Sequence, residues 1–471
     1  MDTTWTRWLG AGRRAAIVVD LGFGDAGKGL VTDALTRALG ATLVVRFNGG
    51  AQAGHNVVAP DGRHHTFAQF GAGSFVAGVR THLAAPAVVH PTALAVEAAH
   101  LARAGVPDAL ARLSVDARAL LVTPVHQAAN RLRELARGAA RHGSCGAGIG
   151  ETVAGALEAP GEALRAGDLR DTTRLASALG RLQARKRAEL GEVIAATRGV
   201  DGAAEEIHVL EDTAVAARWI EAATRVASRI AIVGEGWLAA ALADGRATVF
   251  EGAQGVLLDE WCGFHPFTTW STCTFAGALG LLEGARFDGE IARVGVLRSY
   301  LVRHGAGPLP TEDLALSTRF SEPHNHDGPW QGRVRRGWPD ALLAGYAASV
   351  CGGLDAVALT HLDALPRVPA WRVCRRYGLA RLDPDLFDAT AGGAGVTEAA
   401  RIRPPVGRDL DRQAALARAL TVAEPRYEDV AWHGPLGAER AAAFYEEALG
   451  APVRVRAAGP SAADVRIDGF G

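Results

Sequence analysis

The sequence has little lysine, little cysteine and almost no net charge. Among 50 basic residues only Lys28 and Lys186 are lysines, and the formal net charge is −1. A balanced charge gives no general attraction to nucleic acid or to an anionic membrane, so neither is expected as a partner. The five cysteines form no CxxC pair, which speaks against a zinc ribbon and favours a reducing compartment. We therefore expect a cytoplasmic protein whose partners are small molecules.

Long uninterrupted apolar runs are also missing. No run reaches membrane-spanning length without a charge or a turn residue, and the first 14 residues lack the apolar core of a signal peptide. With 471 residues, the chain is long enough for one large α/β domain or for two smaller domains. We therefore expect a large globular protein without a targeting segment.

Glycine, in contrast, is concentrated near the start of the chain. The β-branched run 17–19 leads into a segment with glycines at positions 22, 24, 27 and 29, and apolar residues with helical spacing follow over 30–38. This pattern predicts a strand, a glycine loop and a helix. Such a junction binds phosphate, because glycine lets the backbone approach an anion and the N–H groups of the loop and the helix N-terminus converge on it.

Two nucleotide-binding motifs compete for this loop. The dinucleotide fingerprint GxGxxG requires an acidic residue after the next strand, where the chain has Arg46, Phe47 and Asn48. The P-loop motif GxxxxGK fits better and is supported by Lys28, because arginine is a poor replacement for a compact ammonium between phosphates. We interpret the other lysine, Lys186, as a solvated residue of an exposed helix.

The P-loop motif is incomplete, since Gly29 stands where a serine or threonine usually ligates Mg²⁺. Asp25 lies inside the loop and is the candidate for this oxygen ligand or for a general base, because a carboxylate beside phosphates would otherwise be repelled. The alternative is that Asp25 only caps the following helix.

Further polar residues follow predicted strands. His55 comes after the second strand, Gln254 ends a strand that begins near residue 247, and Asp363 ends the strand pattern LDAVALTHLD. The carboxyl ends of parallel strands share one crevice, so His55 and Gln254 are expected near the glycine loop. Gln254 could bind a base edge or simply satisfy the backbone of its turn, whereas Asp363 could accept two N–H bonds from guanine.

The remaining patterns are helices and one basic segment. Arg333 and Arg335 project to one side of an extended loop and suit a carboxylate or a phosphate, although a solvated basic loop is the alternative. Helical patterns are expected over 92–104, 125–141, 172–198 and 213–230, with surface loops between the last two.

Seven short motifs occur together in the order and spacing of one family. They are GDAGKG, GGAQAGHN, FEGAQGVLLD, GAGPLPTE, GRVRRGW, THLD and AAGP. On these motifs the chain from about residue 17 onward resembles adenylosuccinate synthetase. The resemblance implies an α/β fold around a large, mostly parallel central sheet with flanking helices and a P-loop-like phosphate site. It also implies an N-terminal extension at residues 1–14, a single ligase domain over 15–471, and a homodimer.

The family joins aspartate to C6 of inosine monophosphate (IMP), using GTP and Mg²⁺. By resemblance, Asp25 takes a proton from the base and binds Mg²⁺ together with the Gly54 carbonyl, His55 donates a proton near the phosphates, and Gln254 steadies the base. The base oxygen is phosphorylated, and an amine then displaces the phosphate. The catalytic residues implied in this way are Asp25, Lys28, His55 and Gln254.

The resemblance also assigns residues to each ligand. Those implied for GTP are Gly24, Asp25, Gly27, Lys28, Gly29, Gly54, His55, Asn56, Arg335, His361, Asp363 and Gly459. Those implied for the amino acid are Gln331, Gly332, Arg333 and Arg335. Those implied for the acceptor are Gln52, Cys145, Gln254, Thr269 and Trp270.

The departures from the family pattern gather on the IMP phosphate. Gln52 and Cys145 replace an asparagine and a threonine that grip this phosphate in the family, and Trp270 replaces a serine. The stretch that supplies an arginine from the partner subunit in the family carries Glu158 and Glu162 here. A dianionic phosphate needs converging donors or cations, so these changes weaken its site.

We therefore predict a GTP- and Mg²⁺-dependent carbon–nitrogen ligase that joins aspartate or a related amino acid to a purine-like acceptor other than IMP. One alternative is a genuine adenylosuccinate synthetase, in which another arginine such as Arg165 reaches the phosphate. The other is a catalytically silent GTP-binding regulatory protein.

Overall fold

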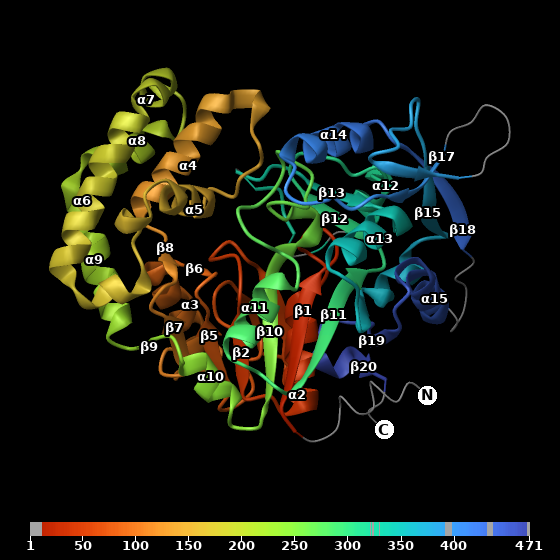
Figure 1. The fold of residues 1–471 in the computed structure, drawn as a ribbon, viewed down its shortest axis with the longest axis horizontal. Coiled ribbons are helices and arrows are strands. Elements are labelled where there is room, and N and C mark those ends of the chain that lie inside the picture. Colours follow the sequence, from red (N-terminus) through yellow and green to blue (C-terminus); the bar gives the residue numbers. More distant parts are fainter. Residues whose placement is uncertain are drawn as a thin grey trace.

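The protein is built on one large, mostly parallel β-sheet (Figure 1). The computed structural model describes residues 12–320, 322, 325–328, 330–390, 398–430 and 437–468, so most of the predicted extension at residues 1–14 lies outside the described part. The sheet has ten strands in the order β20-β19-β14-β11-β1-β10-β2-β5-β7-β9, and neighbouring strands are parallel except for β19 and β20. The predicted α/β class with a mostly parallel central sheet is confirmed.

The strands of this sheet are β1 (Arg14–Asp20), β2 (Leu43–Arg46), β5 (Arg80–Leu83), β7 (Leu113–Asp116), β9 (Ala231–Val233), β10 (Ala247–Gly255), β11 (Glu290–Arg298), β14 (Ala356–Thr360), β19 (Val453–Ala457) and β20 (Val465–Ile467).

β1 lies in the middle of the sheet because its side chains are apolar on both faces. Residues 15–19 are completely buried, as expected for a parallel strand covered on both sides. Val18 is paired with Glu251 of β10 on one side and with Val294 of β11 on the other. Because these neighbours come from distant parts of the chain, the carboxyl end of β1 opens into the kind of crevice where open α/β sheets bind ligands.

Helices flank the sheet on both faces (Figure 1). The predicted helix after the glycine loop is confirmed as α2 (Lys28–Leu39). The other helices are α3 (Pro91–Arg103), α4 (Pro124–Arg137), α5 (Ile149–Glu158), α6 (Thr172–Glu189), α7 (Gly191–Thr197), α8 (Ala203–Glu211), α9 (Thr213–Ala227), α10 (Trp237–Leu242), α11 (Ala276–Gly284), α12 (Leu314–Arg319), α13 (Ala341–Val350), α14 (Leu410–Thr421) and α15 (Gly437–Leu449).

The helical group α4–α9 beside β7 and β9 corrects two expectations (Figure 1). α8 occupies the segment expected to be surface loop; it is short and buries the polar Glu206, which is 2.9 Å from Arg131, so its apolar periodicity is weak. Lys186 is buried rather than solvated, and its ammonium pairs with Glu151 at 2.8 Å and Glu189 at 2.9 Å. Tertiary packing of α6 against its neighbours, which periodicity alone does not reveal, produces this burial.

Smaller sheets follow several strands of the main sheet. The hairpin β3 (His55–Val58) and β4 (His64–Phe67) follows β2, and the ribbon β12 (Leu301–His304) and β13 (Val334–Gly337) follows β11. Among the described residues no helix is long and apolar enough to cross a bilayer. The remaining strands are β6 (Val88–Val89), β8 (Leu120–Leu121), β15 (Trp371–Gly378), β16 (Phe387–Ala389), β17 (Glu398–Ile402) and β18 (Glu424–Val430).

Candidate active site

The glycine loop after β1 is folded around a buried carboxylate. Asp20 is fully buried, and it accepts hydrogen bonds from the N–H groups of Gly22 (2.8 Å), Gly24 (3.2 Å) and Ala26 (2.6 Å). The Lys28 ammonium lies 3.3 Å from the same carboxylate and donates to the Gly24 carbonyl at 2.8 Å. Asp20 was not identified from the sequence, although an acidic residue directly before a glycine loop could have signalled it.

α2 begins without a side-chain cap. Its N-cap is Gly27, with φ of 91°, and no side chain caps the first turn, so the alternative that Asp25 only caps this helix is wrong. A Cβ on Gly29 would lie 2.8 Å from the Asn56 carbonyl oxygen and 2.9 Å from the His55 carbonyl carbon. Glycine at position 29 therefore lets β3 pack directly against the start of the helix.

His55 belongs to a buried charged network. Its Nδ1 lies 2.6 Å from Oε1 of Glu251, whose Oε2 accepts the Ala72 N–H at 2.9 Å and lies 4.0 Å from Arg46. Burial lowers the pKa of His55 to about 4, and Arg46 and Lys28 act in the same direction against Glu251. Burial raises the pKa of Glu251, but Arg46 and His55 outweigh it and the pKa is lowered. The pair is thus a neutral imidazole held by an ionised carboxylate.

Asp25 is held as an ionised carboxylate. Arg298, at the end of β11, donates to the Asp25 carbonyl at 2.9 Å and lies 3.3 Å from Oδ2, which also accepts the Asn325 amide at 2.5 Å. His304 Nε2 is 3.9 Å from the same oxygen. Burial acts to raise the pKa of Asp25, but His304, Arg298 and Asn325 outweigh it and hold the pKa well below its usual range. Within the described part of the chain Oδ1 of Asp25 has no hydrogen bond, which leaves it available to a cation.

Arg298 also binds a second carboxylate. It donates to Glu322 at 2.8 Å and to the Tyr300 hydroxyl at 2.9 Å, and that hydroxyl donates to Glu322. None of these groups around Asp25 was identified from the sequence. A charged residue closing the apolar pattern of β11 could have signalled Arg298, whereas Asn325 lies 300 residues from Asp25 and has no local signal.

Two side-chain amide oxygens are buried against neighbouring glycines after β2. A Cβ on Gly49 would lie 2.6 Å from Oε1 of Gln254, and one on Gly50 would lie 3.0 Å from Oε1 of Gln52. Among the described residues neither oxygen has a hydrogen-bond partner. The Gln254 side chain therefore does not satisfy the backbone of its turn, and its φ of 57° is unusual for a residue other than glycine.

The four residues predicted to be catalytic lie around this loop. A Cβ on Gly24 would touch the Gln254 backbone at 3.1 Å. Lys28 and Asp25 belong to the loop itself, and β3 with His55 packs on Gly29. The expectation that the carboxyl ends of the strands gather these side chains is confirmed by this geometry.

Trp270 packs beside the first turn of α5. A Cβ on Gly150, the second residue of this helix, would lie 2.8 Å from Cδ1 of Trp270, which is 50% exposed. In the loop before the helix, burial raises the pKa of the Cys145 thiol, which is therefore neutral and a weak donor. The N–H of Thr269 is already bound to the Leu258 carbonyl at 2.7 Å. A helix N-terminus is a favourable place for an anion, and here an indole packs beside the first turn.

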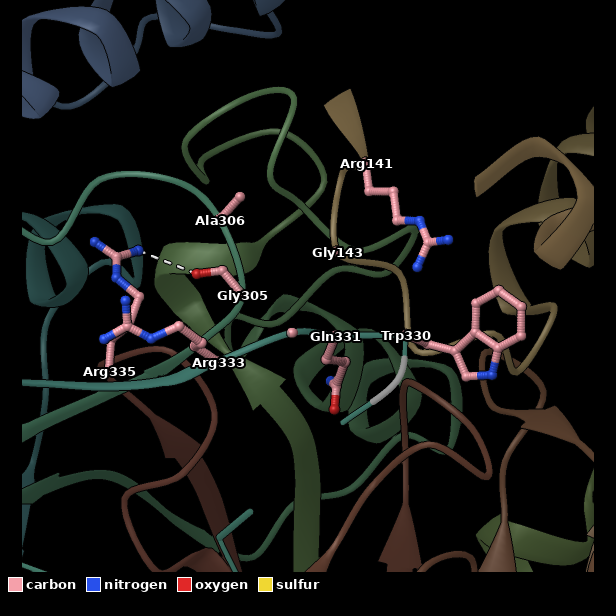
Figure 2. Close-up of a pocket in the computed structure, with 9 residues that line it drawn as sticks. Arg141, Gly143, Gly305, Ala306, Trp330, Gln331, Arg333 and Arg335 are labelled. Carbon is pink, nitrogen blue, oxygen red and sulfur yellow. Dashed lines mark hydrogen bonds between the residues drawn. The ribbon is translucent and has the colours of Figure 1, made fainter. Parts of the chain in front are cut away.

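A pocket of about 400 Å³ lies beside the β12–β13 ribbon (Figure 2). All four residues predicted for the amino acid line it, namely Gln331, Gly332, Arg333 and Arg335. Figure 2 shows the two arginines on one side of the pocket. Arg335 lies in β13 and Arg333 directly before it, which corrects the expectation of an extended loop, and pairing with β12 explains the difference.

The residues predicted for guanine follow β14 and β19. β14 ends at Thr360, which corrects the expected strand end at Asp363, because His361 has a φ of 56° and turns the chain into a short 3₁₀ helix, η5 (Leu362–Arg367). Asp363 is exposed and lies 3.7 Å from Arg367. Burial and the charge of Arg298 lower the pKa of His361 to about 3, so His361 is neutral and close to the Asp25 cluster. Gly459 lies in the turn after β19.

Comparison with known proteins agrees with the geometry. A profile of the family described as adenylosuccinate synthetase matches residues 17–399. The adenylosuccinate synthetase of Anaeromyxobacter dehalogenans (strain 2CP-1) is 34% identical over 374 residues, which cover 79% of this chain and 82% of that protein. The adenylosuccinate synthetase of Moorella thermoacetica is 31% identical over 464 residues, covering 95% and 97%.

Solved structures show the same fold. The fully ligated adenylosuccinate synthetase of Plasmodium falciparum superposes with a TM-score of 0.76 at 20% identity, over 96% of this chain and 99% of that one. The succinoaminodeoxyadenylate synthetase PurZ of cyanophage S-2L, bound to dGMP and dATP, gives a TM-score of 0.58 at 17% identity, over 97% and 95%. From the profile match and the curated relatives, the chain belongs to the adenylosuccinate synthetase family of GTP-dependent carbon–nitrogen ligases.

Proposed function

We propose that this family member phosphorylates the oxo group of a purine-like acceptor with GTP, displaces the phosphate with the amine of an acidic amino acid, and prefers an acceptor other than IMP. The observation that carries the proposal is the pair of buried amide oxygens of Gln52 and Gln254 over Gly49 and Gly50. A buried acceptor without a donor costs about 1–3 kcal/mol, so a ligand that brings N–H or O–H groups is stabilised there.

The two amides suit different parts of such a ligand. The base of an oxo-purine can donate another N–H group to Gln254, while Asp25 beside it accepts the lactam proton. A sugar hydroxyl can donate to Gln52, whereas a phosphate dianion has no proton to offer this oxygen. The donor chemistry at Gln52 therefore favours a ligand that is hydroxylated rather than phosphorylated at this point.

Near Gly50, where α5 begins with Ile149, the described residues offer no phosphate anchor either. Trp270 packs beside the first turn of α5, and Cys145 offers a neutral thiol in place of a hydroxyl donor. Glu162 is held by Arg185 at 2.5 Å, and Arg165 donates to the Arg118 carbonyl at 2.7 Å. None of these groups supplies the cationic cluster that a 5′-phosphate requires.

The residues of the loop have distinct proposed roles. The ionised Asp25, with Oδ1 available, fits a hard cation, and we assign Mg²⁺ to this carboxylate and the Gly54 carbonyl. When bound, Mg²⁺ neutralises charge on the transferred phosphoryl group. Lys28 approaches the same phosphates. His55 becomes a proton donor only when an arriving phosphate stabilises its cationic form, because it is neutral in the free protein.

Steady-state kinetics with a panel of acceptors test the proposal. IMP, inosine and dGMP are each offered with GTP and L-aspartate while phosphate release and product mass are recorded; dGMP is included because the cyanophage relative was solved with it. We expect product with an oxo-purine other than IMP, and a kcat/KM for IMP below about 10⁴ M⁻¹s⁻¹. The variant Trp270→Ser uncovers α5 and should increase kcat/KM for IMP.

The kinetic result distinguishes a genuine adenylosuccinate synthetase from a ligase that prefers another acceptor. Efficient adenylosuccinate formation above about 10⁴ M⁻¹s⁻¹ would identify a genuine adenylosuccinate synthetase and refute the altered acceptor. A preference for inosine over IMP that Trp270→Ser reverses would support the proposal.

A further inference from the structure

The amino-acid pocket has a second cationic wall. Besides Arg333 and Arg335, its lining includes Arg141 and Trp330, which lie on the opposite side (Figure 2). Arg141 follows α4 and precedes the glycine-rich loop 142–150, whereas the other two arginines belong to the β12–β13 ribbon. The pocket therefore joins two segments of the chain that each bring a guanidinium to it.

The charges in the pocket favour an acidic ligand. Arg335 is held by Glu312 at 2.5 Å and by the Gly305 and Gly307 carbonyls at 3.1 and 2.7 Å. In the described part of the chain the guanidinium of Arg333 makes neither a hydrogen bond nor an ion pair, and it is exposed to the pocket. One wall can thus bind one carboxylate through Arg333, with Arg335 beside it.

The opposite wall is rigidly supported. The Trp330 ring lies 5.9 Å from the Arg141 guanidinium and 5.7 Å from that of Arg131. A Cβ on Gly146 would lie 3.2 Å from Trp330 Cγ, so the indole is packed closely on this loop. Arg131 is itself fixed by the Gly146 carbonyl at 3.0 Å. Cation–π contacts of this kind hold Arg141 beside the indole face.

The size of the pocket exceeds that of a small amino acid. Its volume of about 400 Å³ equals the volume of roughly a dozen molecules of liquid water, at about 30 Å³ each. Figure 2 shows Arg333 and Arg141 on opposite sides of this volume. A longer donor can cover both walls.

We propose that the amine donor is an acidic amino acid longer than aspartate, with one carboxylate on Arg333 and a second acidic group on Arg141, its chain lying along Trp330. This inference rests on the proposed ligase function and names the donor class of the same enzyme. Arg141 is then a specificity-determining residue, because it discriminates donors by the position of their distal charge.

Donor competition tests the inference. L-aspartate, L-glutamate and L-2-aminoadipate are compared by donor-dependent phosphate release with GTP and the acceptor panel, and by calorimetric titration of the enzyme without acceptor. We expect a longer donor to exceed aspartate at least tenfold in kcat/KM. Arg141→Gln should cost this donor about tenfold to a hundredfold, mainly in KM, the effect of one charge-assisted hydrogen bond, and should cost aspartate much less.

A matched control separates this effect from general loss of charge. Arg225→Gln removes an exposed arginine of α9 that pairs with Glu221 at 2.6 Å and does not line the pocket, and it should change neither donor. A preference for aspartate that Arg141→Gln does not alter would overturn the donor inference and leave the ligase function intact. If phosphate release depends on no donor with any acceptor, the ligase proposal fails. The calorimetric titrations then still show which donor binds. Binding of 2-aminoadipate that Arg141→Gln abolishes supports the inference, and absence of that binding overturns it.

Discussion

Lys28 and Asp20 form a buried ion pair beneath the glycine loop, with 3.3 Å between Nζ and Oδ2 and side chains 1% and 0% exposed. Three backbone N–H groups of the loop donate to the same carboxylate. The loop therefore has an internal anion that maintains its shape and fixes the ammonium before any phosphate arrives.

Removing the charge of Asp20 should destabilise the whole protein. Asp20→Asn leaves Lys28 buried without its partner, and breaking a buried pair in this way costs about 3–5 kcal/mol. Urea unfolding measures the change. Asp288→Asn is the control, because the Arg13–Asp288 pair is exposed and should contribute about 0–1 kcal/mol. The double variant Asp20→Asn/Lys28→Met completes the cycle. If its loss of unfolding free energy equals the sum of the losses of the two single variants, the two groups are not coupled.

Two substitutions should separate chemistry from nucleotide binding. Asp25→Asn removes a proton acceptor and the proposed metal ligand, and His55→Ala removes the proposed proton donor, so both should abolish turnover on the true substrate while GTP still binds. Product formation and binding of a fluorescent GTP analogue are measured in parallel. His208→Ala, an exposed histidine of α8, should behave as the unmodified protein. Near-normal turnover of either site variant would contradict the assigned roles.

The phosphoryl donor should be GTP rather than ATP. Asp363 can accept two N–H bonds from guanine but repels the N1 lone pair of adenine, and a carboxylate that the bound base buries without a donor costs about 1–3 kcal/mol, or one to two decades in affinity. Competition between GTP, ATP and dATP for one binding site gives the ratio. Asp363→Asn should reduce the ratio of GTP affinity to ATP affinity. Asp383→Asn, the control in an exposed loop, should leave this ratio unchanged. Equal affinities in the unmodified protein would exclude a guanine site at Asp363.

Stability should fall in mild acid. Burial lowers the pKa of His55 and His82 to about 4 and of His126 to about 3, whereas unfolded histidine titrates near 6.5. Below pH 6.5 the unfolded chain therefore binds protons that the folded chain does not, and the free energy of unfolding decreases as pH falls towards 4, by about 1.4 kcal/mol per pH unit for each histidine.

Urea midpoints between pH 7 and pH 5 measure this slope. Burial raises the pKa of Asp340 to about 6, and this carboxyl opposes the trend between pH 4 and 6 without cancelling several histidines. His126→Gln keeps a polar group near Thr123 and should flatten the slope, while His208→Ala should not. A midpoint that stays constant from pH 7 to 5 would show that the histidines titrate normally in the folded protein.

Features encoded by neighbouring residues could be predicted from the sequence. The strand, glycine loop and helix from β1 to α2 have apolar periodicity and glycine spacing within 26 residues, Arg14–Leu39, and they form as expected. Placing His55 and Gln254 by the loop needed only the rule that parallel strands share a carboxyl edge.

Long-range pairing explains what could not be predicted. Arg298 and Asn325 reach Asp25 from 273 and 300 residues away, and no local pattern records that contact. Burial of Lys186 depends on Glu151, which lies on another helix. Such groups become visible only when packing places their charges together.

The position of β1 in the sheet also affects the synthesis of the protein. Arg14 of β1 pairs with Ala247 of β10 and with Glu290 of β11. At about 5–20 residues per second, the ribosome needs roughly 10 to 50 s to reach these partners after β1 has been made. During that time the nascent strand has neither neighbour, so the phosphate loop becomes ordered late in biogenesis. A fragment released before β10 would contain the complete glycine motif and still be unable to form a nucleotide site.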